Sequence, residues 1–493
     1  MVSFKDFSKR TFAVILAALA LTVCCTACGN EQTPQESNSN PSVSDAKDKT
    51  SSDDSKTASE DSSTTSKEET SPESPVSDFE YKGTADGNGI MITKYTGTDS
   101  NVVIPKKINN KPVTIIGDIT TLGEETFDEN TSLTSVTIPD SVTLIDSCVF
   151  NDCTNLTNIT IPDSVTSIGG SSFEGTAWYN NQPDGLVYVG KVAYKYKGDM
   201  SENTSIEIKN GTLGIAGNAF YSCKNLTNIT IPDSVTFIGD NAFCYCENLA
   251  SITIPDNITS IGYCAFEGTE WYNNQPDGLV YAGKVVYNYK GDMPKNTSIE
   301  IKNGTLGIAE DAFDHRTNLA SITIPNSVIS IGSDAFNNCE NLASITIPDS
   351  VTSIGGSPLT FCESLTSIIV DEANNTYSSV DGVLFNKDKT TLISCPGGKA
   401  GEYAIPESVT SIGPSAFFNC KKLKSVIIPN SVKSIDVDAF GDTSFTSITI
   451  PDSVTSMFGD IFYDCDNLTE IRGKAGSTAE YYANSQNITF KAQ

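Results

Sequence analysis

The segment Thr160–Gly169, TIPDSVTSIG, decides the fold, because it returns almost unchanged along the chain. It recurs as TIPDSVTFIG from Thr230, as TIPDSVTSIG from Thr346 and as TIPDSVTSMFG from Thr449. Between these copies lie degenerate ones, and the commonest spacing is that of Pro139 and Pro162, 23 residues. Repetition at a fixed period of this length is typical of solenoids, in which each unit stacks on the one before.

One copy, LASITIPNSVISIGSDAFNNCEN from Leu319 to Asn341, shows which side chains should face inward. Apolar and polar residues alternate at its start, as in a half-buried strand, and Pro325 ends that strand because proline has no N–H to donate. The apolar residues Val328 and Ile331 then point inward again. Ala335, Phe336 and Cys339 follow on one face of a short helical turn. The predicted inward residues are Leu319, Ile322, Ile324, Val328, Ile331, Ala335, Phe336 and Cys339.

The pattern resembles the LxxIxIPxxVxxIGxxAFxxCxx consensus of the leucine-rich repeats in BspA-like bacterial surface proteins. The resemblance implies a repeat solenoid: a curved array with a parallel β-sheet face, short helical turns opposite and inserted β-hairpins. It also implies display outside the cell and binding of host proteins or other surface partners, without implying a particular ligand.

The same resemblance divides the chain beyond its first 78 residues. The opening YTGTDSNVVIPKKINNKPVTIIG is similar to the capping repeat of the family, and GKAGSTAEYYANSQNITFKAQ is similar to its closing cap. The predicted segments are an N-terminal capping repeat at 79–130, a repeat solenoid at 131–470 and a C-terminal cap at 471–493. Three insertions interrupt the solenoid near 176–203, 269–296 and 372–404.

The first residues read as an export signal followed by a tether. Lys9 and Arg10 precede a short apolar run and then CCTACGN, which is the pattern of a secretory signal. TACG resembles the lipobox of bacterial lipoproteins, which implies a signal peptide at 1–28 and lipidation of Cys28. Segment 29–78 carries 12 acidic residues against 4 lysines and no aromatic residue, so we expect a disordered tether.

Charge and residue usage argue against several function classes. The chain has 32 basic and 61 acidic residues, a net charge of −29, so it would be repelled by nucleic acid. Its single histidine, His315, has no neighbouring nucleophile in sequence, and no metal-binding or phosphate-binding motif occurs. Glu207 and Glu300 replace a strand threonine, but duplication explains them better than catalysis does. We therefore predict no enzyme, no cofactor and no metal.

Two kinds of position are candidate ligand contacts. The duplicated insertions begin with the aromatic pairs Trp178–Tyr179 and Trp271–Tyr272, which suit either partner binding or sealing of the core where the stack is interrupted. The strands should also present a hydroxyl-rich face, on which Ile369 and Ile427 stand where other repeats have Thr.

These observations predict a cell-surface lipoprotein, held at the membrane by its lipid, whose solenoid mediates protein binding or adhesion to a macromolecular partner. A glycan-binding surface lipoprotein associated with polysaccharide use is the first alternative. A structural envelope protein with no dedicated ligand is the second.

Overall fold

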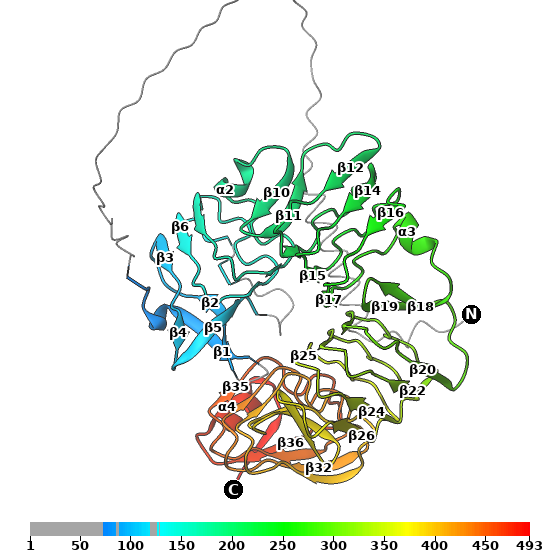
Figure 1. Ribbon diagram of the computed structural model, residues 1–493. Helices are drawn as coiled ribbons and strands as arrows, with labels where there is room; N and C mark the ends of the chain where they lie inside the picture. The colour runs from blue at the N-terminus through cyan, green and yellow to red at the C-terminus, as the bar shows by residue number, and fades with distance from the viewer. Residues whose placement is uncertain (1–71, 85–87, 119–125, 128) are drawn as a thin grey trace, which may run out of the picture. The chain divides into compact units, whose positions relative to one another are not determined.

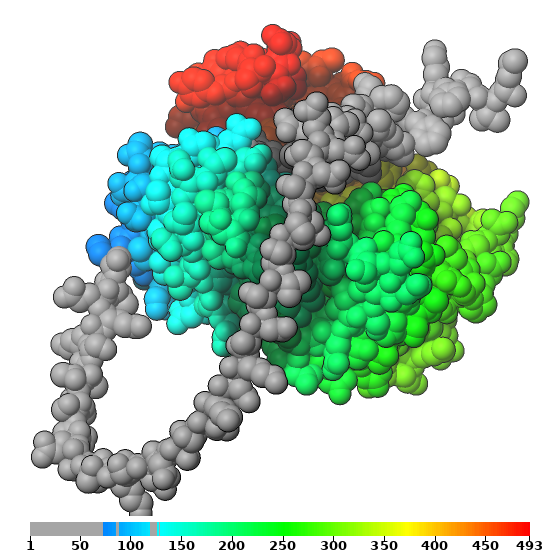
Figure 2. All heavy atoms as spheres, turned by 90° about the horizontal axis from the view of Figure 1, so that it is seen from above, coloured from blue at the N-terminus to red at the C-terminus, as the bar shows by residue number. Residues whose placement is uncertain are grey.

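A computed structural model describes residues 72–84, 88–118, 126–127 and 129–493 (Figure 1). The predicted signal peptide with Cys28, and most of the predicted tether, lie outside these residues. The described chain is a repeat solenoid, as predicted, and each regular repeat supplies two short strands that pair in parallel with the same strands of its neighbours. Consecutive repeats pack against one another in chain order (Figure 2).

The first strand of each repeat carries the Thr-Ile motif, and these strands form what we call the first sheets. In β14 (Leu226–Thr230) and β16 (Ser251–Thr253), Asn228 lies opposite Ser251 and Thr230 opposite Thr253. The constant repeat length sets this register, so equivalent residues form rows across the sheet. The other strands of the first sheets are β3 (Asn101–Val103), β6 (Ser135–Thr137), β8 (Asn158–Thr160), β12 (Thr204–Glu207), β20 (Thr297–Glu300), β22 (Leu319–Thr323), β24 (Ser344–Ile347), β26 (Ser367–Val370), β30 (Gly401–Ala404), β32 (Leu423–Ile427), β34 (Ser447–Thr449), β36 (Glu470–Gly473) and β37 (Thr489–Ala492).

The sequence did not predict a second set of parallel sheets. These sheets are built from the two residues before the glycine that ends the TIPDSVTSIG motif, or from their equivalents in other repeats. β15 (Phe237–Ile238) pairs with β13 (Gly214–Ile215) on one side and β17 (Ser260–Ile261) on the other. The glycine allows this close stacking, since a Cβ at Gly239 would lie 2.5 Å from Gly217 N. The remaining short strands of these second sheets are β7 (Leu144–Ile145), β9 (Ser167–Ile168), β21 (Gly307–Ile308), β23 (Ser330–Ile331), β25 (Ser353–Ile354), β31 (Ser411–Ile412), β33 (Ser434–Ile435) and β35 (Ser456–Met457).

Each second sheet begins with an antiparallel hairpin, and three of these hairpins come from the insertions. In the first insertion the hairpin turns at Gly190–Lys191, and Val192 of its second strand then pairs in parallel with Gly214. The insertions are therefore parts of the sheets rather than projections. The hairpins are β1 (Phe79–Gly83) with β2 (Ile90–Tyr95), β10 (Gly185–Val189) with β11 (Val192–Lys197), β18 (Gly278–Ala282) with β19 (Val285–Lys290), and β27 (Tyr377–Val380) with β28 (Val383–Asn386).

The N-terminal hairpin and the third insertion carry additional strands. In the N-terminal cap, β2 pairs in parallel with β5 (Lys111–Ile116), which is also paired with the two-residue strand β4 (Lys107–Ile108). In the third insertion a first turn at Asp381–Gly382, both in left-handed conformation, precedes a second turn after Asn386. The second turn leads into β29 (Thr391–Ser394), so this insertion is a three-stranded meander.

The side of each repeat opposite the first sheets is formed by tight turns, to which no regular helix is assigned in the described regular repeats. Two residues per repeat, four positions apart, adopt a left-handed backbone, for example Asn218 and Ser222, both with φ of 57°. Between them the Phe220 N–H donates to the carbonyl of Ala242 in the next repeat at 2.8 Å. A helix would need those N–H groups for itself. Backbone hydrogen bonds between repeats therefore hold this side together.

Helices are short among the described residues: η1 (Val76–Asp78), α2 (Ala177–Asn180), α3 (Glu270–Asn273) and α4 (Thr478–Ser485). None of them is long and apolar enough to cross a membrane.

The core is a ladder of stacked phenylalanines between the two sets of sheets. The rings of Phe220, Phe243 and Phe266 are fully buried and nearly parallel, with centroids 5.3 and 5.5 Å apart. The repeat cysteines close the ladder on its turn side, where the Cys246 thiol donates to the carbonyl of Phe220 at 2.9 Å. The predicted inward Phe and Cys positions are confirmed.

Candidate binding surface

The outward side chains of the first sheets form the most regular exposed surface of the described chain. In β16 the inward residue is Ile252, while Ser251 and Thr253 are exposed. Neighbouring side chains in the Ser/Asn row bond one another along the stack, as in the Asn228 amide donating to the Ser205 hydroxyl at 2.9 Å. Because none of these groups packs against the core, they are available for contact with a partner.

Ile369 and Ile427 point outward, where the alternation of their strands places them. They are 47% and 60% exposed, and they face outward beside Thr346 and Ala404 respectively. The third insertion separates β26 from β30, so the two isoleucines belong to different sheets. Together with Ala404 they give this part of the hydroxyl-rich face an apolar character that the other first sheets lack.

The insertion aromatics, predicted as candidate ligand contacts, pack against the core instead of standing clear of it. Trp178 and Trp271 are partly buried, with centroids 5.7 Å from Phe173 and 4.9 Å from Phe266. Their partner tyrosines follow the same trend, since Tyr179 is partly buried and Tyr272 is buried. This placement favours the sealing interpretation over the binding one.

Local hydrogen bonds fix each aromatic pair on a single helical turn. At α2 the hydroxyl of Thr176 accepts from the Tyr179 N–H at 3.0 Å, which is an N-cap. At the other end the Lys197 ammonium donates to the carbonyls of Tyr179, Asn180 and Gln182 at 3.3, 2.8 and 2.6 Å. Lys290 does the same at α3, so both copies are built to hold the rings in place.

Buried tyrosines of the first two insertions and of the C-terminal cap have a role that sequence reasoning missed. In regular repeats the backbone N–H of the core phenylalanine donates to a carbonyl of the next repeat. At the first insertion the Phe173 N–H donates instead to the hydroxyl of Tyr194, at 2.9 Å. Burial raises the pKa of Tyr194 well above its usual range, so the phenol stays neutral and can accept this bond. Each such tyrosine follows its donor by 21 residues: Tyr194 after Phe173, Tyr287 after Phe266 and Tyr482 after Ile461. That constant spacing is the signal that could have revealed them.

A pair of exposed tyrosines on the turn side was also missed. Tyr221 and Tyr245 are 45% and 48% exposed, and their rings meet edge to face with centroids 5.8 Å apart. Tyr245 occupies a left-handed position, φ 58°, where most other repeats have Gly, Asp, Asn or Ser and only His315 and Phe361 are comparably large among the described repeats. A bulky residue is disfavoured in that conformation, so the substitution marks the place.

The two carboxylates singled out in the sequence, Glu207 and Glu300, lie in different sheets. Glu207 and Glu300 face outward from β12 and β20, and His315 contacts Asp314 with Nδ1 2.8 Å from Oδ1. No group of three potential metal ligands occurs among the residues that the structure describes.

One carboxyl pair does share a hydrogen-bond donor. The Tyr263 N–H donates to Asp240 Oδ1 at 3.0 Å and to Glu310 Oε2 at 3.2 Å. Desolvation by the surrounding protein, and then the charge of Asp240, raise the pKa of Glu310 well above its usual range. The titratable groups whose charges interact with this pair, Asp146 and Asp311, are also acids. Burial raises the pKa of Asp146 to about 6 and that of Asp311 to about 8.

We expect the solenoid to lose stability as the pH rises above the pKa that Glu310 has in the unfolded chain and through its raised pKa in the folded protein. The folded protein keeps a proton on this pair that the unfolded chain, with a Glu pKa of about 4.3, has already released. Stability is therefore full at acidic pH and falls as the pH passes through the raised pKa. Urea midpoints measured from pH 5 to 9 should fall less in Glu310→Gln than in the wild type. The matched control is Ser147→Ala, because Ser147 occupies the position equivalent to Asp240 before the first insertion; an unchanged slope in Glu310→Gln would contradict the assignment.

Comparison with known proteins agrees with this architecture. The family described as "BspA type Leucine rich repeat region (6 copies)" matches residues 106–197, 181–275, 286–397 and 397–490. No curated protein shows significant similarity to the chain.

Several solved structures of bacterial repeat proteins are also similar. A leucine-rich cell surface protein from Faecalibacterium prausnitzii is 25% identical over 86% of this chain and 95% of its own, with a TM-score of 0.35. A leucine-rich-repeat protein from Eubacterium ventriosum is 27% identical over 55% of this chain and 60% of its own, with a TM-score of 0.30. One from Bacteroides ovatus is 23% identical over 84% and 98%, with a TM-score of 0.26.

Proposed function

Since the chain belongs to the BspA-type leucine-rich-repeat family, we propose that it is a surface lipoprotein that binds a macromolecular partner through its first sheets. Export and lipidation at Cys28 are carried by the sequence resemblance, and they stay predictions because those residues lie outside the described part. The binding role is supported by one observation above all. The outward rows of the first sheets are exposed, ordered and free of any packing duty.

The partner that this surface suits best is an extracellular protein. Ile369 and Ile427 offer exposed apolar area on an otherwise hydroxyl-rich face. Burial of such side chains at the centre of an interface is the usual source of affinity between proteins. The surrounding Ser and Thr hydroxyls would supply hydrogen bonds at the rim.

A glycan partner is the second candidate, and the exposed Tyr221–Tyr245 pair favours it. Tyrosine combines an apolar ring face with a polar hydroxyl, which suits stacking against a sugar ring. This pair lies on the turn side, so the two candidate functions use different surfaces of the chain and can be separated by mutation.

We expect the double variant Ile369→Ser with Ile427→Ser to weaken binding of a protein partner about tenfold or more, which corresponds to about 1.4 kcal/mol. Full-length protein would be tested against a panel of extracellular matrix proteins and a glycan array. Tyr221→Ser with Tyr245→Ser should weaken only a glycan partner. Tyr481→Ser is the control, because Tyr481 is 72% exposed on α4 and belongs to neither surface. Binding that survives both double variants would rule out both surfaces.

A further inference from the structure

Lys82 of β1 places its ammonium between two carboxyl groups. Its Nζ lies 3.0 Å from Asp118 Oδ2 and 3.6 Å from Asp436 Oδ1. Asp118 follows β5 in the N-terminal cap, whereas Asp436 follows β33 in a repeat much later in the chain. The three side chains therefore come from one strand and from the segments that directly follow two others.

The group is enclosed to a degree that the surface ion pairs of this chain do not reach. The side chains of Lys82, Asp118 and Asp436 are 10%, 3% and 18% exposed. The ring of Phe458 covers the ammonium, with its centroid 5.0 Å from Nζ. By contrast the Lys474–Asp452 pair has nearly the same Nζ–Oδ2 distance, 2.9 Å, but its side chains are 69% and 52% exposed.

We propose that Lys82 and Asp118 join in an intramolecular isopeptide bond, with Asp436 as the acid that assists the reaction. A proton passes from the ammonium to the Asp118 carboxylate, which leaves a neutral amine beside a neutral acid. The amine then attacks Cγ of Asp118, a C–N bond forms, one C–O bond breaks, and water leaves. The ammonium and carboxylate are thus converted into one amide and one water, with no oxidant, reductant or further reactant.

Asp436 is suited to donate and recover a proton during this step. Burial raises the pKa of Asp436, the charge of Lys82 opposes that rise, and the charge of Asp118 adds to it. A third acid, Asp146, contacts Gly117 next to Asp118, and its pKa is raised by burial to about 6. Two carboxyl groups thus face a single, largely buried amine, and a third lies near Asp118. This crowding of acids favours a neutral carboxyl group beside the reacting pair.

The bond would close the N-terminal end of the solenoid covalently. β1 is the edge strand of the cap, paired with β2 alone, and Asp118 lies beyond β5 on the other side of β2. A link from β1 to the end of β5 spans the hairpin, so the cap could not peel away strand by strand. This inference concerns the cap only and stands independently of the proposed binding function.

Peptide mapping of the full-length protein by mass spectrometry tests the proposal. We expect the Lys82 and Asp118 peptides to appear joined, lighter than their sum by one water, and uncut by trypsin at Lys82. Lys82→Arg and Asp118→Ala should each abolish the joined species, and Asp436→Asn should abolish or greatly reduce it while both reacting residues remain. Lys474 and Asp452 should yield separate peptides, which controls for proximity alone. Separate, unmodified Lys82 and Asp118 peptides from folded wild-type protein would overturn the proposal, and an undiminished link in Asp436→Asn would overturn the role of Asp436.

Discussion

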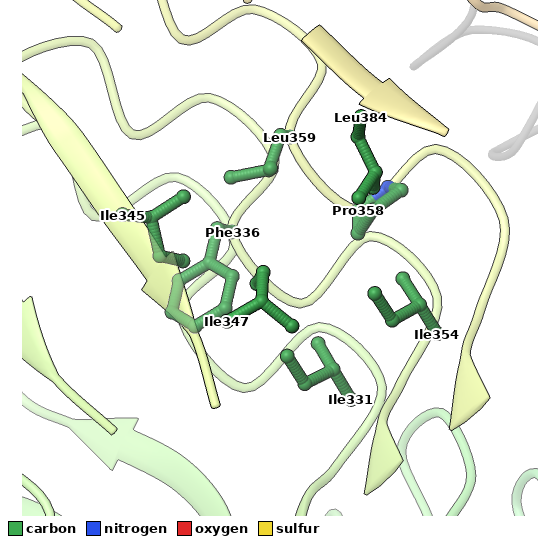
Figure 3. A pocket seen from close by; sticks show the side chains of 8 residues that line it. All are labelled: Ile331, Phe336, Ile345, Ile347, Ile354, Pro358, Leu359 and Leu384. Atoms are coloured by element: carbon green, nitrogen blue, oxygen red, sulfur yellow. The ribbon is translucent and has the colours of Figure 1, made fainter. Parts of the chain in front are cut away.

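Replacing Phe336 with Ala is expected to reduce the free energy of unfolding by about 3–5 kcal/mol. Its ring is fully buried and stacks on Phe313 with centroids 5.3 Å apart. On the other side the next repeat has Leu359 in place of phenylalanine, and Figure 3 shows Phe336 among Ile345, Ile347 and Leu359. The backbone of both repeats is tied by hydrogen bonds, so the void cannot collapse freely and the loss should lie near the upper end of that range.

The loss should also spread, since a solenoid repeat is supported only by its neighbours. Amide hydrogen exchange is the appropriate measurement because it reports each repeat separately. We expect faster exchange in the repeats that contain Phe313 and Leu359, and little change in the N-terminal cap. Thr346→Ala, on the exposed face of the adjacent strand, is the control and should change stability by no more than about 0.5 kcal/mol. A Phe336→Ala protein with wild-type stability would show that the ladder is not the main source of cohesion.

Trp271→Ala is the second substitution with a large expected effect, about 3 kcal/mol of stability. The indole packs on Phe266, and its backbone N–H donates to Leu249 of the preceding repeat at 2.8 Å. Because the ring fills the place where an ordinary repeat would stack, its removal exposes the end of the ladder to water. Trp178→Ala should act in the same way at the first insertion.

Thermal unfolding and partner binding measured on the same samples separate sealing from recognition. We expect the melting temperature to fall in both single variants, nearly additively in the double variant because the sites do not touch. Binding per folded molecule should be unchanged. Tyr481→Ala is the matched control, since its side chain is exposed on α4 and belongs to neither proposed binding surface, so its loss should change neither the melting temperature nor binding. A variant that melts normally yet no longer binds would instead make the tryptophans ligand contacts.

Much of the fold was predictable because it depends on local periodicity. The alternation around Ile322 and the position of Pro325 define the first strand, and the spacing to Phe336 defines the buried ladder. The second sheets were missed because two residues such as Phe237 and Ile238 carry no strand signal by themselves. The left-handed turns were missed for a related reason, since AFYSC in isolation suits a helix and only the carbonyls of the next repeat override it.

The candidate sites divide along the same line. The outward direction of Ile369 and Ile427 follows from strand alternation, which is local. Whether Trp178 faces a ligand or Phe173 depends on how the insertion joins the second sheet, and no sequence pattern states that. The approach of Lys82 to Asp118 and Asp436 depends on the stacking of separate repeats, so it could be found only in three dimensions.

The tyrosine-ended hairpins bear on how such a chain can change length over evolution. In the first two insertions a tyrosine hydroxyl of the hairpin accepts the N–H bond that a carbonyl of the next repeat would otherwise accept. Such a hairpin leaves the preceding repeat with no unsatisfied N–H and so forms a complete boundary inside the array. Trp178 and Trp271 begin two nearly identical insertions 93 residues apart, the mark of a duplicated block. Gene duplication or deletion between two such boundaries adds or removes a whole block whose ends are already satisfied, so a lineage can vary its reach without inventing a new terminus each time.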